Sequence, residues 1–356
     1  MSSINRIIAF YLPQFHPIPE NDKWWGKGFT EWTNTAKAKP LFQGHYQPHV
    51  PSDLGFYDLR VPETRIAQAE MAKKYGVEAF CYYHYWFSGK RLIERPFTEV
   101  LSSNEPDFPF CLCWANKSWS GIWHGSPNKI LIKQDYPGME DHTNHFYELL
   151  KAFTDDRYLK VDNKPVFLVY HPKLIPDVQK VTDHWRELAL NAGLNGLHLV
   201  GVDHFSDWDP IPDGFDASLQ QRLPALNGKI PLQYLSLNIK KLLQKSNWQL
   251  TIYDYKKIWK SFISLAQKPY ITYPCIVPNW DNSPRSGTNS LVITNSSPQL
   301  FGKQIKLASE KVSSYPEDNK LIFLKSWNEW AEGNYMEPDL KFGHAYLDVL
   351  KENIRK

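Results

Sequence analysis

Short apolar runs rich in β-branched and aromatic residues recur along the chain, with helical patterns between them. Alternation of strands with helices predicts a parallel sheet, and eight such strands predict a closed (β/α)8 barrel, the TIM barrel. An open, doubly wound sheet is the structural alternative. The sixth run has the weakest strand pattern. The expected strands are Ile7–Tyr11, Ala79–Tyr83, Phe110–Trp114, Val166–Tyr170, Leu197–Val202, Phe215–Leu219, Tyr273–Val277 and Leu321–Lys325.

Helices are expected between or after these strands. The segment Pro62–Tyr75 begins with proline and ends before Gly76, as helices commonly do. A chain of 356 residues exceeds the usual domain size, but such barrels reach this length as one unit. We therefore expect one domain over residues 1–356, with an insertion at 224–267 between the sixth and seventh strands. Apolar residues three or four positions apart predict further helices at Glu140–Phe153, Lys180–Ala192, Tyr255–Ala266, Gln299–Ser313 and His344–Ile354.

The segments that follow the strands concentrate Trp, Tyr, His, Asn and carboxylate residues. In a (β/α)8 barrel the carboxyl ends of all strands meet at one rim, where active sites lie. Agreement of six segments is hard to explain by loop packing alone, so we expect a functional site at this rim. The six segments are residues 11–34, 82–90, 113–125, 203–210, 278–287 and 327–338.

The composition suits a carbohydrate site better than a nucleic-acid or membrane site. Aromatic residues make up 15% of the chain and include 14 tryptophans, and flat rings with polar edges fit sugar faces as well as protein cores. A net charge of +3 directs no strong field at nucleic acid or at a membrane, so nucleic acid is not an expected partner. No stretch approaches the ~20 apolar residues of a transmembrane helix.

The four cysteines predict buried free thiols. They are Cys81, Cys111, Cys113 and Cys275, they lie in apolar runs, and they form no C-x-x-C motif or zinc site. Free thiols suit a reducing compartment. The N-terminal sequence has a four-residue apolar run before Tyr11 and no signal-peptide pattern, so a cytoplasmic location is expected.

The expected insertion at 224–267 carries lysines beside apolar and aromatic residues. A solvated helix face is the ordinary interpretation, and peripheral contact with an anionic membrane or with a lipid-linked substrate is the alternative. These lysines are Lys240, Lys241, Lys245, Lys256, Lys257 and Lys260.

Glu329 and Glu332 lie three residues apart, after the last expected strand and beside Trp327 and Trp330. In one helical turn their side chains would share a face, with Cβ atoms roughly 5–6 Å apart. Two carboxyls this close, among desolvating rings, titrate differently, so that one acts as an acid and the other as a base or nucleophile. Retaining glycosidases use such a short separation, about 5–5.5 Å. The ordinary alternative is two glutamates that complement a helix N-terminus or are solvated.

The segment "WNEWAEG" at 327–333, followed by "EPD" at 337–339, resembles the WbsX family, described as glycosyltransferases of lipopolysaccharide O-antigen assembly. That family is similar to glycoside hydrolase family 99, the endo-α-mannosidase family. The resemblance covers nearly the whole chain and implies a (β/α)8 barrel. Further matching blocks, in the family's order, are residues 9–34, 45–60, 80–91, 108–116, 157–172, 185–189 and 273–282.

The resemblance also implies roles for the two glutamates. In the related hydrolases the first glutamate is thought to deprotonate the sugar 2-hydroxyl, which attacks the anomeric carbon and gives a 1,2-anhydro intermediate. The second protonates the leaving oxygen and then deprotonates the acceptor. Matched here, Glu329 is the assisting base and Glu332 the general acid/base, with retention of configuration. Lys117 departs from the family pattern, which has an acidic residue there, so the sugar or linkage need not be that of the commonest members.

Other rim residues are expected to bind the substrate through ring stacking and hydrogen bonds to hydroxyls. Glu337 is expected to orient the rim rather than to react. For each residue singly, core packing or loop anchoring is the alternative. The expected set is Tyr11, Gln14, His16, Trp25, Glu31, Trp32, His84, Trp86, Trp114, Asn116, Trp280, Asp281, Trp327, Asn328 and Glu337.

The leading expectation is WbsX-type retaining glycosyl transfer on a bacterial surface polysaccharide. An oligosaccharide or polysaccharide is the substrate, with a nucleotide-sugar donor or a lipid-linked acceptor. The D-x-D match at Asp207–Asp209 is a weak signal, and no Gly-rich phosphate cradle is present. This favours the second hypothesis, a retaining hydrolase or transglycosidase acting on α-mannose-type linkages. A non-catalytic carbohydrate-binding barrel is the third. No metal or cofactor is expected.

Overall fold

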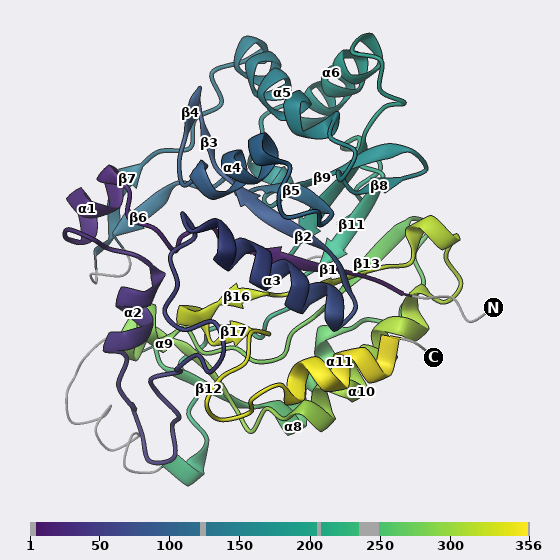
Figure 1. Ribbon diagram of the computed structural model, residues 1–356. Helices are drawn as coiled ribbons and strands as arrows, with labels where there is room; N and C mark the ends of the chain where they lie inside the picture. The colour runs from purple at the N-terminus through teal and green to yellow at the C-terminus, as the bar shows by residue number, and fades with distance from the viewer. Residues whose placement is uncertain (1–4, 122–125, 205–207, 235–248, 355–356) are drawn as a thin grey trace.

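The barrel predicted from the sequence is present in the computed structural model, which describes residues 5–121, 126–204, 208–234 and 249–354. The strands pair in parallel, and the pairings β1–β15 and β9–β10 close the sheet (Figure 1). All eight predicted strands are confirmed, the sixth included. They are β1 (Arg6–Tyr11), β2 (Val77–His84), β5 (Phe110–Trp114), β9 (Lys164–Val169), β10 (His198–Asp203), β11 (Ala217–Gln220), β13 (Ile271–Ile276) and β15 (Leu321–Leu324).

The strands are buried along almost their whole length because both of their faces are covered. Helices cover the outside, and side chains fill the inside of a barrel of this size. Inside, Phe10 stacks on Tyr83 with ring centroids 5.4 Å apart and contacts Phe323, which in turn contacts Tyr273. The four cysteines are buried free thiols, as predicted.

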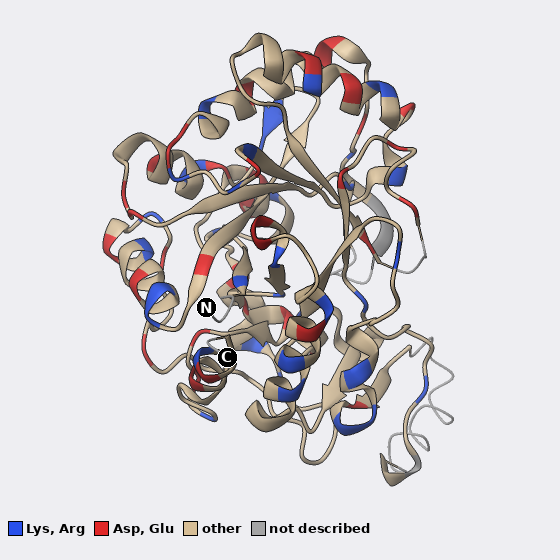
Figure 2. Cartoon of the chain, turned by 90° about the vertical axis from the view of Figure 1, so that its right-hand side faces the viewer, with Lys and Arg blue, Asp and Glu red and all other residues tan. Residues whose placement is uncertain are grey.

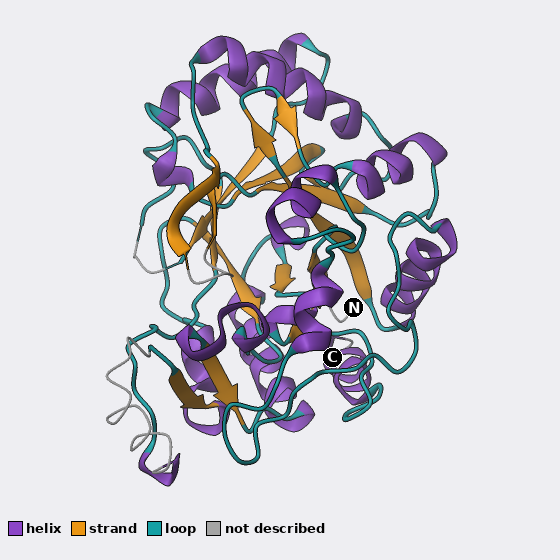
Figure 3. Cartoon of the chain, turned by 90° about the vertical axis from the view of Figure 1, so that its left-hand side faces the viewer, coloured by secondary structure: helices purple, strands orange, loops and turns teal. Residues whose placement is uncertain are grey.

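Helices surround the strands (Figure 3). Five of the six predicted helices are present to within two residues at each end. Among the signals that set their limits, the side chain of Ser297 accepts a hydrogen bond from the backbone of Leu300, and proline follows at the first helical position. These helices are α3 (Pro62–Lys74), α5 (Met139–Phe153), α6 (Val178–Asn191), α10 (Pro298–Val312) and α11 (Ala345–Ile354).

The helix expected at Tyr255–Ala266 is wrong in length. The structure has only a short helix α8 (Tyr255–Ile258) and a 3₁₀ turn η4 (Trp259–Phe262). Gln304 of α10 donates a hydrogen bond to the carbonyl of Trp259, which therefore does not need a helical partner. Helix α4 (Arg95–Ser103) was not predicted, because its nine residues bury only three side chains and are shorter than the window of about 11–18 residues over which helical periodicity is recognised.

The region between β11 and β13 includes a small element outside the barrel. Strand β12 (Thr251–Asp254) pairs in parallel with β14 (Leu291–Thr294), and a 3₁₀ turn η3 (Leu232–Tyr234) precedes it. Of the six lysines named in the sequence analysis, Lys240, Lys241 and Lys245 lie outside the described residues, whereas Lys256 and Lys257 lie on α8 and Lys260 on η4. In the described part of the chain, no helix is long and apolar enough to cross a membrane.

The loops at the carboxyl ends of the strands carry most of the remaining structure. Figure 2 shows both signs of charge spread over the outer helices, in keeping with the small net charge. The loop elements are α1 (Pro19–Trp25), α2 (Glu31–Lys37), β3 (Trp86–Phe87), β4 (Lys90–Arg91), β6 (Trp119–Gly121), β7 (Ser126–Ile132), η2 (Pro172–Leu174), α9 (Ser283–Ser286), η5 (Gly287–Asn289), β16 (Asn328–Glu329), η7 (Trp330–Glu332) and β17 (Asn334–Tyr335). At the opposite end lie β8 (Lys160–Val161) and η6 (Glu317–Asn319).

Candidate active site

The chain that leaves β15 is fixed to the end of β1 by three hydrogen bonds. The backbone of Trp327 donates to the carbonyl of Phe10 at 2.7 Å. The amide of Asn328 then holds both sides of one residue: its Oδ1 accepts from the Leu12 N–H at 2.7 Å, and its Nδ2 donates to the Leu12 carbonyl at 3.0 Å. These bonds determine where the following glutamates lie.

Glu329 and Glu332 occupy a tighter turn than the helical turn that we expected. Glu329 ends β16, and η7 is a 3₁₀ turn, in which residues three apart nearly eclipse one another. Gly333 ends the turn with φ 58°, and a Cβ there would lie 2.9 Å from the Cβ of Asp281. The backbone of Asp281 donates to the carbonyl of Glu332 at 2.7 Å, so glycine permits the close approach that anchors Glu332.

A cavity of about 340 Å³ lies over the end of the barrel and includes both glutamates. Its volume is within the range of small-molecule sites. Gln14 is 4% exposed, and its Nε2 has no hydrogen-bond partner among the described residues. A buried donor without a partner is costly, which suits a polar ligand at this point. The lining comprises Leu12, Gln14, Trp25, Tyr83, Tyr85, Ala115, Lys117, Ser118, Trp119, Ser120, Leu131, Tyr170, Trp280, Arg285, Lys325, Glu329 and Glu332.

Glu329 is held by a buried lysine. The Lys325 Nζ lies 3.0 Å from Glu329 Oε2 and donates to the Tyr83 hydroxyl at 3.0 Å. It also sits over the Trp280 ring, 5.5 Å from the centroid. Burial alone would raise the pKa of Glu329, but Lys325 and other partners outweigh it and lower that pKa from its ordinary value. Glu329 is therefore ionised at neutral pH.

Glu332 has the opposite character. Burial, and then the charge of Glu329, raise the pKa of Glu332 to about 8, against the opposing effects of Arg285 and Lys325. Arg285 forms an ion pair with Glu332, while the Lys325 Nζ lies 3.9 Å from Glu332 Oε2. The side chain of Glu332 keeps 16% of its surface exposed. One cavity thus contains an ionised carboxylate and a carboxyl that holds a proton at neutral pH, which is the arrangement that general acid/base chemistry needs.

Comparison with known proteins identifies the family of this chain. The model of the family described as "Glycosyltransferase WbsX" matches residues 7–350. The chain belongs to the WbsX glycosyltransferase family. Two proteins named "Uncharacterized protein WxcX", from two strains of Xanthomonas campestris pv. campestris, are each 36% identical over 351 residues. These matches cover 98% of this chain and 50% of each relative, so the chain spans about half the length of the curated relatives it matches.

Solved structures share the barrel of this WbsX-family chain. A "Glycoside hydrolase-like protein" has a TM-score of 0.61 at 16% identity and covers 100% of this chain and 95% of its own. The GH99 endo-α-mannosidase from Bacteroides thetaiotaomicron has a TM-score of 0.58 at 15% identity, over 98% of this chain and 96% of its own. At these identities the likeness shows the fold. By its description the family is one of carbohydrate-active enzymes, and its barrel is shared with solved glycoside hydrolases.

Part of the predicted site of the WbsX-family chain lines the cavity. Gln14, Trp25 and Trp280 do so together with both glutamates. Glu31 does not: its side chain is fully buried and bonds to Arg285. Asp281 faces away, into a separate cavity of about 450 Å³, and accepts hydrogen bonds from His45 and Gln47. Whether any of these residues binds substrate stays a prediction.

Several predicted residues support the rim from inside the protein. Glu337 accepts hydrogen bonds from Tyr57 at 2.9 Å, and from Gln68 and Trp330 at 2.6 Å each. Tyr11 donates to Gln68 at 2.7 Å in the same buried network. Trp32 packs on Trp330, and Trp327 is fully buried against Phe80.

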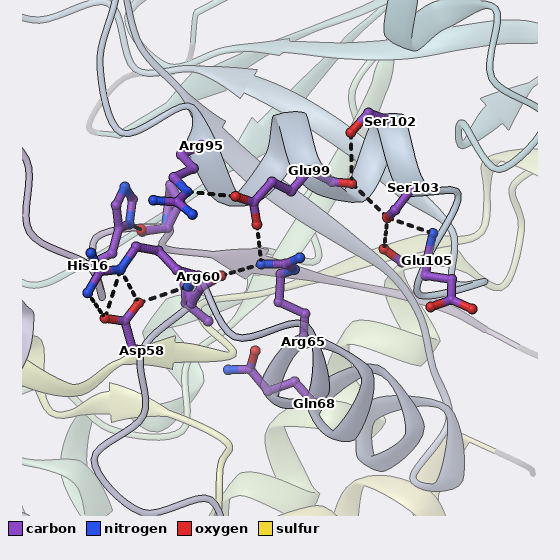
Figure 4. Close-up of polar contacts among 12 residues, drawn as sticks. His16, Asp58, Arg60, Arg65, Gln68, Arg95, Glu99, Ser102, Ser103 and Glu105 are labelled. Carbon is purple, nitrogen blue, oxygen red and sulfur yellow. Dashed lines mark hydrogen bonds and ion pairs between the residues drawn. The ribbon is translucent and has the colours of Figure 1, made fainter.

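His16, Asn116 and three aromatic residues brace other loops. His16 lies beside Asp58 and Arg60, away from the cavity lining (Figure 4). Asn116 holds the loop after β9 by bonds in both directions to the backbone of His171. His84, Trp86 and Trp114 form a packed cluster: His84 Nε2 lies 2.9 Å from His145 Nε2, Trp86 stacks on His145, and Trp114 is fully buried beside it.

The sequence analysis missed two cations and three phenols of the cavity. Lys325 was taken as the last residue of a strand, and Arg285 lies in the rim segment 278–287 without a motif of its own. Tyr83 and Tyr85 lie in the rim segment 82–90, which was the available signal for them, whereas Tyr170 was the last residue of the fourth expected strand and lies in none of the six segments. Among described residues no cluster of His, Cys, Asp or Glu could hold a metal, and Asp207 of the D-x-D match lies outside them.

Proposed function

We propose that this chain catalyses retaining glycosyl transfer onto a polysaccharide, with Glu329 as the assisting base and Glu332 as the general acid/base. The observation that carries the proposal is the cavity in which Lys325 keeps Glu329 ionised while Glu332 holds a proton. An ionised base beside a protonated acid is the starting state that the reaction requires.

The reaction has two steps. In the first, Glu329 takes the proton of the sugar 2-hydroxyl, the 2-oxygen attacks the anomeric carbon, and the leaving oxygen takes the proton of Glu332. In the second, the acceptor hydroxyl attacks the anomeric carbon and gives its proton to Glu332, while the 2-oxygen recovers its proton from Glu329. Both glutamates return to their starting states, and two inversions at one carbon give net retention.

The aromatic and polar residues of the cavity fit a sugar ring. Trp25, Trp119 and Trp280 offer ring faces, and Gln14 offers its Nε2 donor, which has no hydrogen-bond partner in the described part of the chain. We propose a nucleotide-sugar donor and a surface-polysaccharide acceptor, free or lipid-linked, in agreement with the family description. A cytoplasmic location is part of the proposal, because the four free thiols suit a reducing compartment.

Hydrolysis or transglycosylation of α-mannose-type linkages is the second candidate. In hydrolysis, water replaces the acceptor hydroxyl and the roles of the glutamates are unchanged. The observation in its favour is the exposed 16% of the Glu332 side chain, through which water can reach the acid/base.

Proton NMR with two ligand panels tests the proposal and separates the candidates. One panel contains nucleotide-sugars, GDP-mannose included, each with an acceptor oligosaccharide; the other contains α-linked manno-oligosaccharides alone. New anomeric signals of retained configuration with the first panel support transfer, and with the second they support hydrolysis. Inverted products contradict the mechanism in either case, and binding without turnover, equal for the Glu332→Gln variant, indicates a binding barrel.

A further inference from the structure

Five charged side chains meet at the catalytic pair, and their charges do not cancel. The carboxylates are Glu31, Glu329 and Glu332, and the cations are Lys325 and Arg285. With all five ionised, the cluster carries one excess negative charge, and one bound proton makes it neutral. Because an uncompensated charge is costly in a buried site, the cluster favours retaining one proton near neutral pH.

Arg285 is shared between two carboxylates. Its Nε and an outer nitrogen lie 2.8 Å and 2.6 Å from Glu31 Oε1, and its other outer nitrogen pairs with Glu332. The guanidinium is a rigid fork, so it can hold both partners at once without moving. Arg285 comes from α9, Glu31 from α2 and Glu332 from η7, and both α2 and α9 pack against η7.

Glu31 is an unusual residue to bury. Its side chain has 0% exposure, and its Oε2 has no hydrogen-bond partner among the described residues. A buried carboxylate usually satisfies both oxygens, so core packing alone does not explain this position. Burial raises the pKa of Glu31, while Arg285 opposes that rise. The position is explained if the negative charge of Glu31 acts on Arg285.

We propose that Glu31 and Arg285 are positioning residues that together control the protonation of the acid/base. This rests on the proposed role of Glu332. Arg285 stays paired with Glu31 when Glu332 is protonated, and it compensates Glu332 when the proton leaves. Glu332 can thus lose and regain its proton without leaving a buried cation unpaired. Because Glu31 competes for Arg285, the arginine does not hold Glu332 permanently ionised.

Other groups face this cluster and are common to every variant compared below. Tyr83 and Tyr170 are phenols with raised pKa values, raised first by burial, and they stay neutral near pH 8. Lys37, at the end of α2, acts on Glu31 more weakly than Arg285 does. The carboxylate of Asp281 is paired with His45 and faces the second cavity. Tyr85 of the loop after β2 interacts with Glu329, Arg285 and Glu31. Cys275 of β13 interacts with Lys325 and Glu329, and His204 interacts with Lys325.

The test is a carbon-13 NMR titration of the whole chain labelled at the glutamate carboxyl carbons, in the absence of substrate. The Glu332→Gln variant identifies the Glu332 signal. In Glu31→Gln, Arg285 is left with Glu332, and the pKa of Glu332 should fall by about 1–3 units, as for a carboxyl next to an unshared arginine. In Glu31→Asp, which keeps the charge, most of the shift should be reversed.

Glu99→Gln is the matched control. Glu99 also pairs with two arginines, Arg65 at 2.8 Å and Arg95 at 2.6 Å, but outside the cavity (Figure 4). The pKa of Glu332 should not move in this variant. An unchanged pKa in folded Glu31→Gln would overturn the proposal. If that variant does not fold, Arg285→Gln decides: the pKa of Glu332 should rise, and a constant or lower value contradicts the shared pairing.

The titration is independent of turnover, so the two proposals fail separately. If no glycan is converted but the pKa of Glu332 falls in Glu31→Gln, the pairing is correct and the proposed function is wrong. Where turnover is found, the alkaline limb of the kcat/KM profile should move to lower pH in Glu31→Gln by the same shift. Loss of activity with an unchanged pH profile indicates a structural role only and contradicts the proposal.

Discussion

The glutamate cluster at the end of β15 and the histidine cluster at the end of β2 lie on the same rim, yet the first contains charged side chains and the second neutral ones. Around Glu329 and Glu332, charges are kept and balanced by Lys325 and Arg285 beside a cavity. Around His84, charge is avoided. Burial lowers the pKa of His84 to about 3, and His84 Nε2 forms a hydrogen bond with His145 Nε2.

The difference lies in what each cluster faces. Neutral imidazoles are inexpensive to bury among rings such as Trp86 and Trp114, and they add packing area. Buried carboxylates are costly unless paired, so a cluster that keeps them suggests a use for the charge. We therefore expect substitutions in the first cluster to change turnover and substitutions in the second to change stability.

The largest effect is expected for Glu332→Gln. Removing the transferable proton should lower kcat by about 10²- to 10⁴-fold, because this is the usual contribution of a general acid/base. The free energy of unfolding should change far less. Turnover of the preferred glycan and urea unfolding measure the two quantities, with the exposed Glu310→Gln as the control. Turnover by Glu332→Gln equal to that of the original chain would contradict the catalytic role of the glutamate cluster.

Trp114→Ala should have a comparable effect, but on stability. Its ring is fully buried beside His145 and Trp185, so truncation should lower the free energy of unfolding by about 3–5 kcal/mol. The fraction that remains folded should keep its kcat within a few-fold. Urea titration of the variant, beside Tyr147→Ala at a 51% exposed position, measures the loss. A large fall in kcat at unchanged stability would place Trp114 in the chemistry instead.

The histidine cluster should make the fold sensitive to acid. The pKa of His84 is lowered from 6.5 to about 3, so the unfolded chain binds the proton first as the pH falls. Its contribution is complete above pH 6.5 and is lost between pH 6.5 and about 3. At pH 5 the loss is about 2 kcal/mol. Urea unfolding at pH 7 and pH 5 should show a smaller difference for His84→Gln than for the original chain; an equal difference contradicts the neutral pairing.

Lys117→Ala should have the smallest effect. Lys117 is exposed at the edge of the cavity lining, so it can contact a substrate but does not support the catalytic pair. We expect KM to change by up to about tenfold, or 1.4 kcal/mol, with kcat preserved. Initial rates over a range of substrate concentrations separate the two constants. A fall in kcat would extend the catalytic region to the loop after β5.

Much of the fold was open to prediction because strand burial and helix amphipathicity are local patterns. All eight barrel strands and five helices follow from such patterns, whereas the shortened helix at Tyr255 depends on a hydrogen bond from distant Gln304. The proximity of Glu329 and Glu332 could also be predicted from the sequence, because residues three apart in one turn are neighbours whatever surrounds them.

Lys325 and Arg285, the cations of the site, could not be predicted from local sequence patterns. Arg285 reaches Glu31 across 254 positions of sequence, and Lys325 lies among the rings of Phe10, Tyr83 and Trp280, which come from three separate segments. His84, Trp86 and Trp114 are aromatic, like several of the residues that line the cavity, and they also lie at strand ends. Only the packing around His145 shows that their side chains point into the protein and not into the cavity. The sequence by itself determined the barrel, its rim and the proximity of Glu329 and Glu332, since these depend on residue type and spacing. The tertiary structure decided which rim residues face the cavity and which partners set their charge, since burial and ion pairing depend on segments that only folding brings together.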